Sequence, residues 1–220
     1  MDRVFSQQER PLSEMRWAAV AIKAVNPNQR HIGILHRDPS SGVLLLDLAW
    51  HHQLRNAPPS SKYVWIAPDI PAPRLRQVAA RCRQVVRANP GAIPYGFSPP
   101  NDCFDEQTGK FLLGPTRHGL TCATFVLAVF QLVGLKLIRF ESWPTERPSD
   151  CEWQQAVISA LESSNPPASP EHVQAIKNEV GNVRFRPEEV AAAATVSPLP
   201  AEFEICAERA DGILQRLETA

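Results

Sequence analysis

The chain of 220 residues is long enough for one sizeable domain, or for a domain with an appendage. A formal net charge of zero gives no bulk electrostatic reason to expect a nucleic-acid or membrane-surface partner. No apolar run approaches the length of a membrane-spanning helix, and the first residues lack the apolar segment of a signal peptide. We therefore expect a cytoplasmic protein that makes no use of a membrane.

The N-terminal part of the chain predicts a sheet followed by a helix. Residues 1–15 are polar and predict a loose N-terminal arm. Apolar, β-branched segments separated by turn sequences such as NPNQ and RDPSSG then predict strands. These strands cover residues 17–25, 31–35, 43–50 and 63–67. Apolar residues three and four apart between positions 73 and 88 predict an amphipathic helix, with Cys82 packed on its apolar stripe.

The middle of the chain predicts a long loop and a buried helix. Residues 90–119 are rich in proline and glycine, and loops of this length inside a compact domain often carry function. They lead into residues 122–133, which are apolar nearly all round and predict a buried helix that Gly134 ends.

The remainder of the chain predicts short helices joined by proline-rich turns. They cover residues 151–163, with Asp150 as N-cap, and residues 171–181, 186–195 and 200–218. We therefore expect an α+β core over residues 16–145 and a helical extension over residues 146–220. Trp143 and Trp153, at the junction, are candidates for a surface that binds a protein partner, and His172 is expected to face solvent.

The five cysteines predict free thiols rather than bridges or metal ligands. No two of them are spaced as CxxC, and their number is odd. We expect no metal site and no other cofactor. Cys122 differs from the others because it opens the buried helix. A cysteine on an apolar helix is ordinarily packing, but the positive end of the helix dipole favours a thiolate there.

Upstream strands offer partners for this thiol. If the turn after residue 37 closes a hairpin with Leu35 opposite Val43, His31 faces Asp47 on the same side of the sheet. A carboxylate there would hold the imidazole in one orientation. Gly33 lies between them on that face and leaves room for an approaching group. The register is an assumption, since a slip of one residue would turn Asp47 to the other face.

Other residues remain candidates for the same site. His51 and His52, at the end of the third strand, are alternatives to His31 as the base. His118, Gly119 and Thr121 precede the cysteine and are candidates, with Gly33, for an oxyanion hole or a substrate cleft.

Three segments together resemble the circularly permuted NlpC-like branch of the papain-like cysteine hydrolases. They are RHIGIL, LLLDLA and TCATFV, in that chain order, and the resemblance covers residues 17–140. This branch includes relatives of lecithin:retinol acyltransferase and of bacterial NlpC-type peptidases. The resemblance implies an α+β fold in which a small antiparallel sheet packs on a buried, cysteine-bearing helix. It implies Cys122 as nucleophile, His31 as general base and Asp47 as the orienting residue.

The chain also departs from that pattern. The acyltransferase relatives commonly have a second histidine where Asp47 stands and are commonly tethered to a membrane, and the helical extension has no counterpart in them. We therefore expect a hydrolase that cleaves a peptide or isopeptide amide through an acyl-enzyme. The alternatives are acyl transfer or thioester cleavage on a lipid or thioester substrate, and a non-catalytic module that binds a protein partner through its C-terminal helices.

Overall fold

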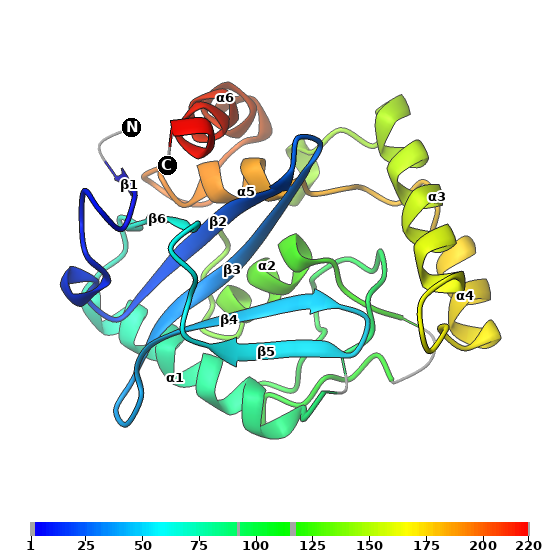
Figure 1. Ribbon diagram of the computed structural model, residues 1–220, viewed down its shortest axis with the longest axis horizontal. Helices are drawn as coiled ribbons and strands as arrows, with labels where there is room; N and C mark the ends of the chain where they lie inside the picture. The colour runs from blue at the N-terminus through cyan, green and yellow to red at the C-terminus, as the bar shows by residue number, and fades with distance from the viewer. Residues whose placement is uncertain (1–2, 92, 115–117, 220) are drawn as a thin grey trace.

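The computed structural model describes residues 3–91, 93–114 and 118–219 (Figure 1). Within these residues the fold is α+β, with a six-stranded sheet in which every neighbouring pair is antiparallel. The strand order is β1-β6-β2-β3-β4-β5. The strands are β1 (Val4–Phe5), β2 (Ala18–Asn26), β3 (Gln29–Asp38), β4 (Gly42–Trp50), β5 (Gln53–Ala57) and β6 (Val64–Ile66).

Six α-helices accompany the sheet in the described residues. They are α1 (Ala72–Ala88), α2 (Cys122–Gln131), α3 (Pro148–Glu162), α4 (Pro170–Lys177), α5 (Pro187–Ala193) and α6 (Phe203–Thr219). Short 3-10 turns occur at Leu12–Glu14 and Phe140–Ser142. No helix in the described part of the chain has the length and apolar character needed to cross a membrane.

Both faces of the central strands are buried, which explains their nearly continuous apolar sequences. Even-numbered residues such as Ile22 and Ile34 join the main core with α1, α2 and α5. Odd-numbered residues such as Leu35 join a smaller core around Met15 and Trp65 on the other face. The period of two expected for these strands is therefore confirmed.

The expected central helices are present. α1 buries Cys82 completely, so the interpretation of this thiol as packing is confirmed. α2 buries every residue from Cys122 to Phe130, and Gly134, in the left-handed region at φ 66°, follows its end. A helix without an exposed face is fixed by its surroundings, so its first residue has a well-defined position.

The N-terminal arm is not loose, contrary to expectation. β1 pairs with β6 at the edge of the sheet, and Met15 is buried in the smaller core. The Trp65 ring nitrogen donates to the Arg10 carbonyl at 3.0 Å, and Arg216 of α6 bonds the carbonyl of Val4 at 3.2 Å. The packing of this segment could not be predicted from its polar sequence, because only a few apolar residues anchor it.

The helical extension packs into the main core. α5 contributes Val190 and Ala191, which are completely buried, and α6 packs beside α5 through Ile213. Residues Ile138 and Ala201 form a parallel bridge that joins the extension to the segment after α2. The extension is therefore continuous with the core through its helices α5 and α6.

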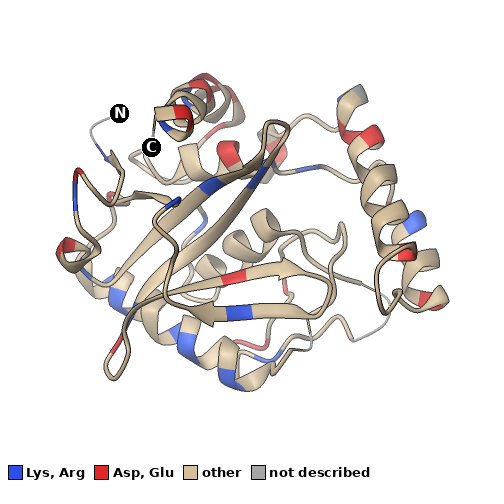
Figure 2. Ribbon diagram, viewed as in Figure 1, with Lys and Arg blue, Asp and Glu red and all other residues tan. Residues whose placement is uncertain are grey.

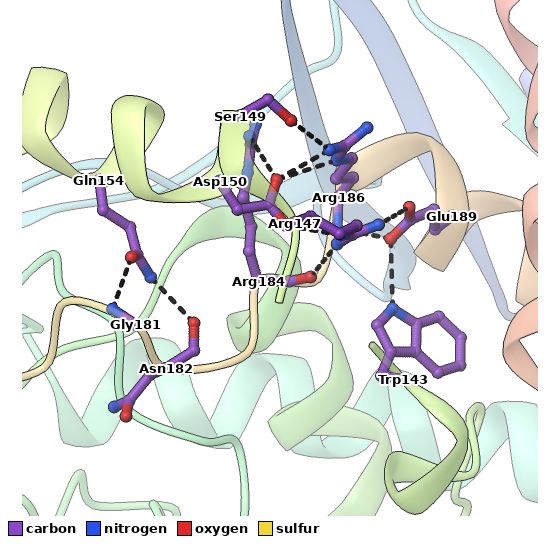
Figure 3. Close-up of polar contacts among 10 residues, drawn as sticks. All are labelled: Trp143, Arg147, Ser149, Asp150, Gln154, Gly181, Asn182, Arg184, Arg186 and Glu189. Atoms are coloured by element: carbon purple, nitrogen blue, oxygen red, sulfur yellow. Dashed lines mark hydrogen bonds and ion pairs between the residues drawn. The ribbon is translucent and has the colours of Figure 1, made fainter. Parts of the chain in front are cut away.

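Asp150 does not cap α3, which begins at Pro148. Its carboxylate instead accepts hydrogen bonds from Arg147, Arg184 and Arg186 (Figure 3). The two tryptophans are not both exposed as expected, and a partner surface at them stays a prediction. Trp143 is buried and donates to Glu189 at 3.2 Å, and Trp153 packs under the guanidinium of Arg184.

Candidate functional site

The hairpin that carries His31 and Asp47 has a register two residues away from the expected one. Leu35 pairs with Leu45, where Val43 was expected. Because side chains alternate with a period of two, a shift of two residues keeps Asp47 on the expected face. The pairing of β3 with β4 runs from the turn to Ile34 opposite Leu46. Beyond that point the two strands diverge, and α2 is seen between them (Figure 1).

Gly33 makes room for Asp47 rather than for a substrate. A Cβ atom built on Gly33 would lie 2.9 Å from the Cβ atom of Asp47, closer than real side chains approach. The expectation that Gly33 lines a cleft is therefore wrong, since the space above it is filled. Without a side chain at Gly33, Asp47 reaches diagonally across the opening toward His31.

His31 and Asp47 form a buried hydrogen-bonded pair. His31 Nε2 lies 2.5 Å from Asp47 Oδ2, and the exposed fractions of the two residues are 8% and 2%. Asp47 is also bound by Arg55, its partner across β4 and β5, whose Nε donates at 3.2 Å; Figure 2 shows the acidic position on β4 beside the basic position on β5. The sequence analysis missed Arg55 because it did not predict β5. The carboxylate thus has a cation on one side and the imidazole on the other.

Cys122 is the first residue of α2 and is 5% exposed. Thr121 is the N-cap, and its hydroxyl accepts from the Thr124 N–H at 3.1 Å. The Thr124 hydroxyl in turn accepts from the Thr121 N–H at 2.8 Å, which completes a reciprocal cap. This cap fixes the turn that carries the thiol at the positive end of the helix dipole.

His31 interacts with the Cys122 side chain as well as with Asp47. Burial on its own would lower the pKa of His31, but hydrogen bonds to Asp47 and Cys122, together with the charges of both groups, raise that pKa to about 9. Since Nε2 is engaged by Asp47, Nδ1 is the ring nitrogen left for Cys122. The structure therefore brings together Cys122, His31 and Asp47, the three residues that the sequence selected.

Tyr95 is a member of this site that the sequence analysis missed. Burial, followed by the charge of the Cys122 thiolate, raises the pKa of the Tyr95 phenol well above its usual range. Tyr95 and Cys122 interact and line the same cleft. A loop tyrosine has no periodic signal in the sequence, and only the folded chain shows its position.

Two glycines let the Tyr95 segment lie against the approach to α2. Leu120 N donates to the Pro94 carbonyl at 3.1 Å, and Gly96 N donates to the Leu120 carbonyl at 3.3 Å. A Cβ atom on Gly119 would lie 2.5 Å from the Pro94 carbonyl oxygen. Gly119 is therefore required for backbone contact and does not itself line the cleft beside the thiol. Of the 90–119 loop, residues 92 and 115–117 lie outside the described part.

His118 has a different role from the expected one. Its Nδ1 lies 2.8 Å from Glu179 Oε1, and the same carboxylate group accepts from the Phe97 N–H at 3.1 Å. His118 is thus tied to the turn after α4 and does not line the cleft beside Cys122. Thr121 does line that cleft, as expected.

The alternative bases lie at another cluster. His51 packs between His52 and His172, with ring centroids 4.0 and 4.5 Å apart, and its Nδ1 accepts from the Tyr95 N–H at 3.3 Å. Burial, followed by the charges of His52 and His172, lowers the pKa of His51 to about 3. His172 is buried, contrary to expectation, and its Nε2 lies 2.9 Å from the Tyr95 carbonyl oxygen. His51 and His172 therefore position the Tyr95 backbone.

A narrow cleft leads to Cys122 from the β2–β3 turn and the extension. It is lined by residues 28–30 of the turn, Tyr95, the first turn of α2, Trp153 and residues of the 184–188 segment. The walls are mostly polar or charged. The extension therefore forms part of the entrance to the thiol.

The remaining thiols have surroundings unlike that of Cys122. All five cysteines are free. Burial raises the pKa of Cys103 and of Cys206 to about 12, and Cys151 is exposed. Among the described residues, no three His, Cys, Asp or Glu side chains are grouped so that they could hold a metal ion.

The comparisons with known proteins give no match. No protein-family model, no curated protein and no solved structure matches this chain. The interpretation of the site therefore depends on its geometry.

Proposed function

We propose that the protein is a thiol hydrolase with a papain-like core of the permuted NlpC type, which cleaves an amide bond in a peptide or protein. The observation that supports this most strongly is the buried imidazole of His31, which Asp47 holds at 2.5 Å and which interacts with Cys122. A thiol, an imidazole and a carboxylate in this order are the groups that nucleophilic catalysis requires.

In the resting enzyme His31 has already taken the proton of Cys122, and in the acylation step the thiolate attacks the carbonyl carbon. A C–S bond forms, and the carbonyl oxygen becomes an oxyanion. The C–N bond then breaks as the imidazolium of His31 gives its proton to the leaving amine. The raised pKa of His31, about 9, keeps the imidazole protonated and ready to give this proton at neutral pH.

In the deacylation step, neutral His31 takes a proton from water as the water oxygen attacks the thioester carbonyl. The C–S bond breaks, the carboxylic acid leaves, and the thiolate–imidazolium pair is restored. Asp47 stabilises the imidazolium and keeps its Nδ1 directed at the thiol. Arg55 holds the carboxylate in place from the other side.

The oxyanion is stabilised by the backbone N–H of Cys122 and by the phenol of Tyr95, which lies next to it. Both donors are fixed before the reaction, one by the capped first turn of α2 and the other by the two histidines that bind the Tyr95 backbone. Fixed donors stabilise the developing charge without reorganisation during the step.

The cleft favours a peptide over a lipid substrate. A lipid acyl chain requires a long apolar channel, whereas the walls beside Cys122 include Asn28 of the β2–β3 turn and Gln29 and Arg30 at the start of β3. Acyl transfer and simple protein binding remain outcomes of the test.

The test uses p-nitrophenyl acetate, which acylates reactive thiols without needing a specific recognition site. We expect a burst of p-nitrophenol, an acetyl group on Cys122 by peptide mass mapping, and its subsequent loss to water. Cys122→Ala should abolish the burst, while Cys103→Ala should leave it unchanged. Acetylation of Cys122 no faster than that of Cys103 would support a binding module, and loss of the acetyl group only to an added amine or alcohol would support a transferase.

A further inference from the structure

Two arginines lie in the cleft beside Cys122 and come from distant parts of the chain. Arg30 belongs to β3 near the β2–β3 turn, and Arg184 belongs to the segment before α5. Neither takes part in the chemistry proposed above. Their place in a cleft that leads to the thiol makes them candidates for substrate recognition.

Arg30 keeps hydrogen-bonding capacity unused. Its Nη1 donates to the Pro27 carbonyl at 2.6 Å, which fixes the side chain on its own turn. Its Nε is buried and has no hydrogen-bond partner among the described residues. A buried donor without a partner is unfavourable, so a ligand that accepts from it gains free energy.

Arg184, which lies in the same cleft, also has a hydrogen-bond donor that is not used. Its guanidinium lies 4.0 Å from the centre of the Trp153 ring, and its Nη1 donates to Asp150 at 3.1 Å. Its Nε is also buried without a partner among the described residues. Asp150 is shared with Arg147 and Arg186, so it neutralises Arg184 only in part (Figure 3).

The charge around the cleft is positive even when its acidic residues are counted. Glu188 lines the same cleft and acts on the charge of Arg184, and Glu189 pairs with Arg147 behind it. Arg30, Arg184 and Glu188 line the cleft, and the ion pairs behind them add Arg147, Arg186, Asp150 and Glu189. The whole group therefore has four arginines against three carboxylates. One anionic group bound in the cleft would bring the net charge of these residues to zero.

We propose that the cleft is a carboxylate-binding subsite, in which Arg30 and Arg184 hold a carboxylate of the substrate near the amide that Cys122 attacks. This inference rests on the proposed thiol hydrolysis and names the substrate class: a peptide with an acidic side chain or a free C-terminal carboxylate close to the cleaved bond. Guanidinium groups recognise carboxylates with strong, directional hydrogen bonds. The extension thereby determines specificity through Arg184 and Trp153.

The first test needs no substrate. Iodoacetate and iodoacetamide alkylate thiols by the same reaction and differ in one carboxylate. The ratio of their rate constants at Cys122, measured by peptide mass mapping, reports whether a carboxylate is favoured beside the thiol. We expect the ratio to exceed that at exposed Cys151 by about tenfold.

The imidazolium of His31 also attracts anions, so variants are needed to measure the contribution of Arg30 to the ratio separately. Arg30→Gln should lower the ratio at Cys122 several-fold, and Arg30→Lys should keep most of it. Glu188→Gln should raise it, because a competing carboxylate is removed. Arg76→Gln, which changes an arginine on α1 that stacks on Trp17, is the matched control and should leave the ratio unchanged. An unchanged ratio in Arg30→Gln, or equal ratios at Cys122 and Cys151, would overturn the inference.

The second test identifies the source of the carboxylate. Paired fluorogenic peptides differ in Glu or Gln beside the cleaved bond, or in a free or amidated C-terminus. If the wild type prefers the Glu peptide and Arg30→Gln loses this preference, the carboxylate belongs to an acidic side chain. If the wild type prefers the free C-terminus and Arg30→Gln loses that preference, the carboxylate is the terminal one. Cleavage without either preference would overturn the subsite while leaving the hydrolase intact. If no peptide is cleaved, the hydrolase proposal fails and the alkylation ratios alone decide the subsite.

Discussion

At the scale of single residues, the account depends on the hydrogen bond between Asp47 and His31. Asp47→Asn keeps the shape of the side chain but removes the charge that stabilises the imidazolium. We expect hydrolysis to fall on the order of 10²-fold or more. Because Asp47 contributes to the raised pKa of His31, the decline of activity on the alkaline side should move from near pH 9 to lower pH.

The measurement is the pH dependence of kcat/KM for the wild type and for Asp47→Asn. Asp69→Asn is the matched control, since Asp69 is a half-exposed carboxylate paired with Arg3 at 2.8 Å. An alkaline limb at the same pH in Asp47→Asn and in the wild type would contradict the role of Asp47.

The same histidine links the stability of the fold to pH. The pKa of His31 is raised from 6.5 to about 9 on folding, so protonated His31 stabilises the folded state below pH 6.5. This contribution, up to about 3 kcal/mol, is lost as pH rises from 6.5 through 9. We expect the free energy of unfolding of His31→Gln, measured with urea, to decline less than that of the wild type across this range. Parallel declines would contradict the raised pKa.

A further prediction for a single residue concerns the hydroxyl of Tyr95. Tyr95→Phe removes the proposed oxyanion donor and keeps the ring that packs against Trp50. We expect kcat to fall about 10²-fold with little change in KM, because the hydroxyl acts mainly in the transition state. A rise in KM at constant kcat would show instead that the hydroxyl contributes to ground-state binding.

At the scale of elements, the site depends on the contact between the Tyr95 segment and the approach to α2. A methyl group on Gly119 would collide with the Pro94 carbonyl oxygen, so Gly119→Ala should push these segments apart. We expect a loss of about 1–3 kcal/mol of stability and markedly slower alkylation of Cys122. Gly114→Ala is the control, because that position has a positive φ but open space around it. It should lose some stability without slowing the alkylation.

The elements also show what the sequence could predict. The helix α2 and the strands β2, β3 and β4 carry continuous apolar patterns, and for that reason Cys122, His31 and Asp47 could be selected. The register of the β3–β4 hairpin could not be derived, because positions two residues apart share a face. β5 was missed because this edge strand is polar and exposed on alternate residues and runs into the sequence APP.

Periodic patterns in the sequence could not identify the cleft residues that lie in loops. Tyr95 and Arg184 lie outside helices and strands, and only long-range packing brings them to the thiol. Asp150 looked like a helix cap because its true partners, Arg184 and Arg186, lie 34 and 36 residues away. Patterns in the sequence thus located Cys122 and His31, while the cleft around them depended on the folded chain.

At the scale of the whole molecule, the extension packs into the same core as the sheet. α5 lies in the main core, and its residues Val190–Ala193 are completely buried. A chain that ends at residue 145 would expose the apolar surface that α5 covers. We expect this shortened chain to lack a cooperative thermal transition by circular dichroism. A cooperative transition at the wild-type temperature would contradict the inclusion of α5 in the core.

The central claim is that Cys122 and His31 form a reactive pair, and the pH dependence of Cys122 alkylation tests it most directly. The rate of iodoacetamide labelling is followed by peptide mass mapping between pH 5 and pH 9, in the wild type and in His31→Asn. The account predicts fast labelling of Cys122 at pH 6, far above that of Cys103, and loss of this reactivity in His31→Asn. Labelling of Cys122 at pH 6 that is no faster than that of Cys103, or that is unchanged in His31→Asn, would contradict it.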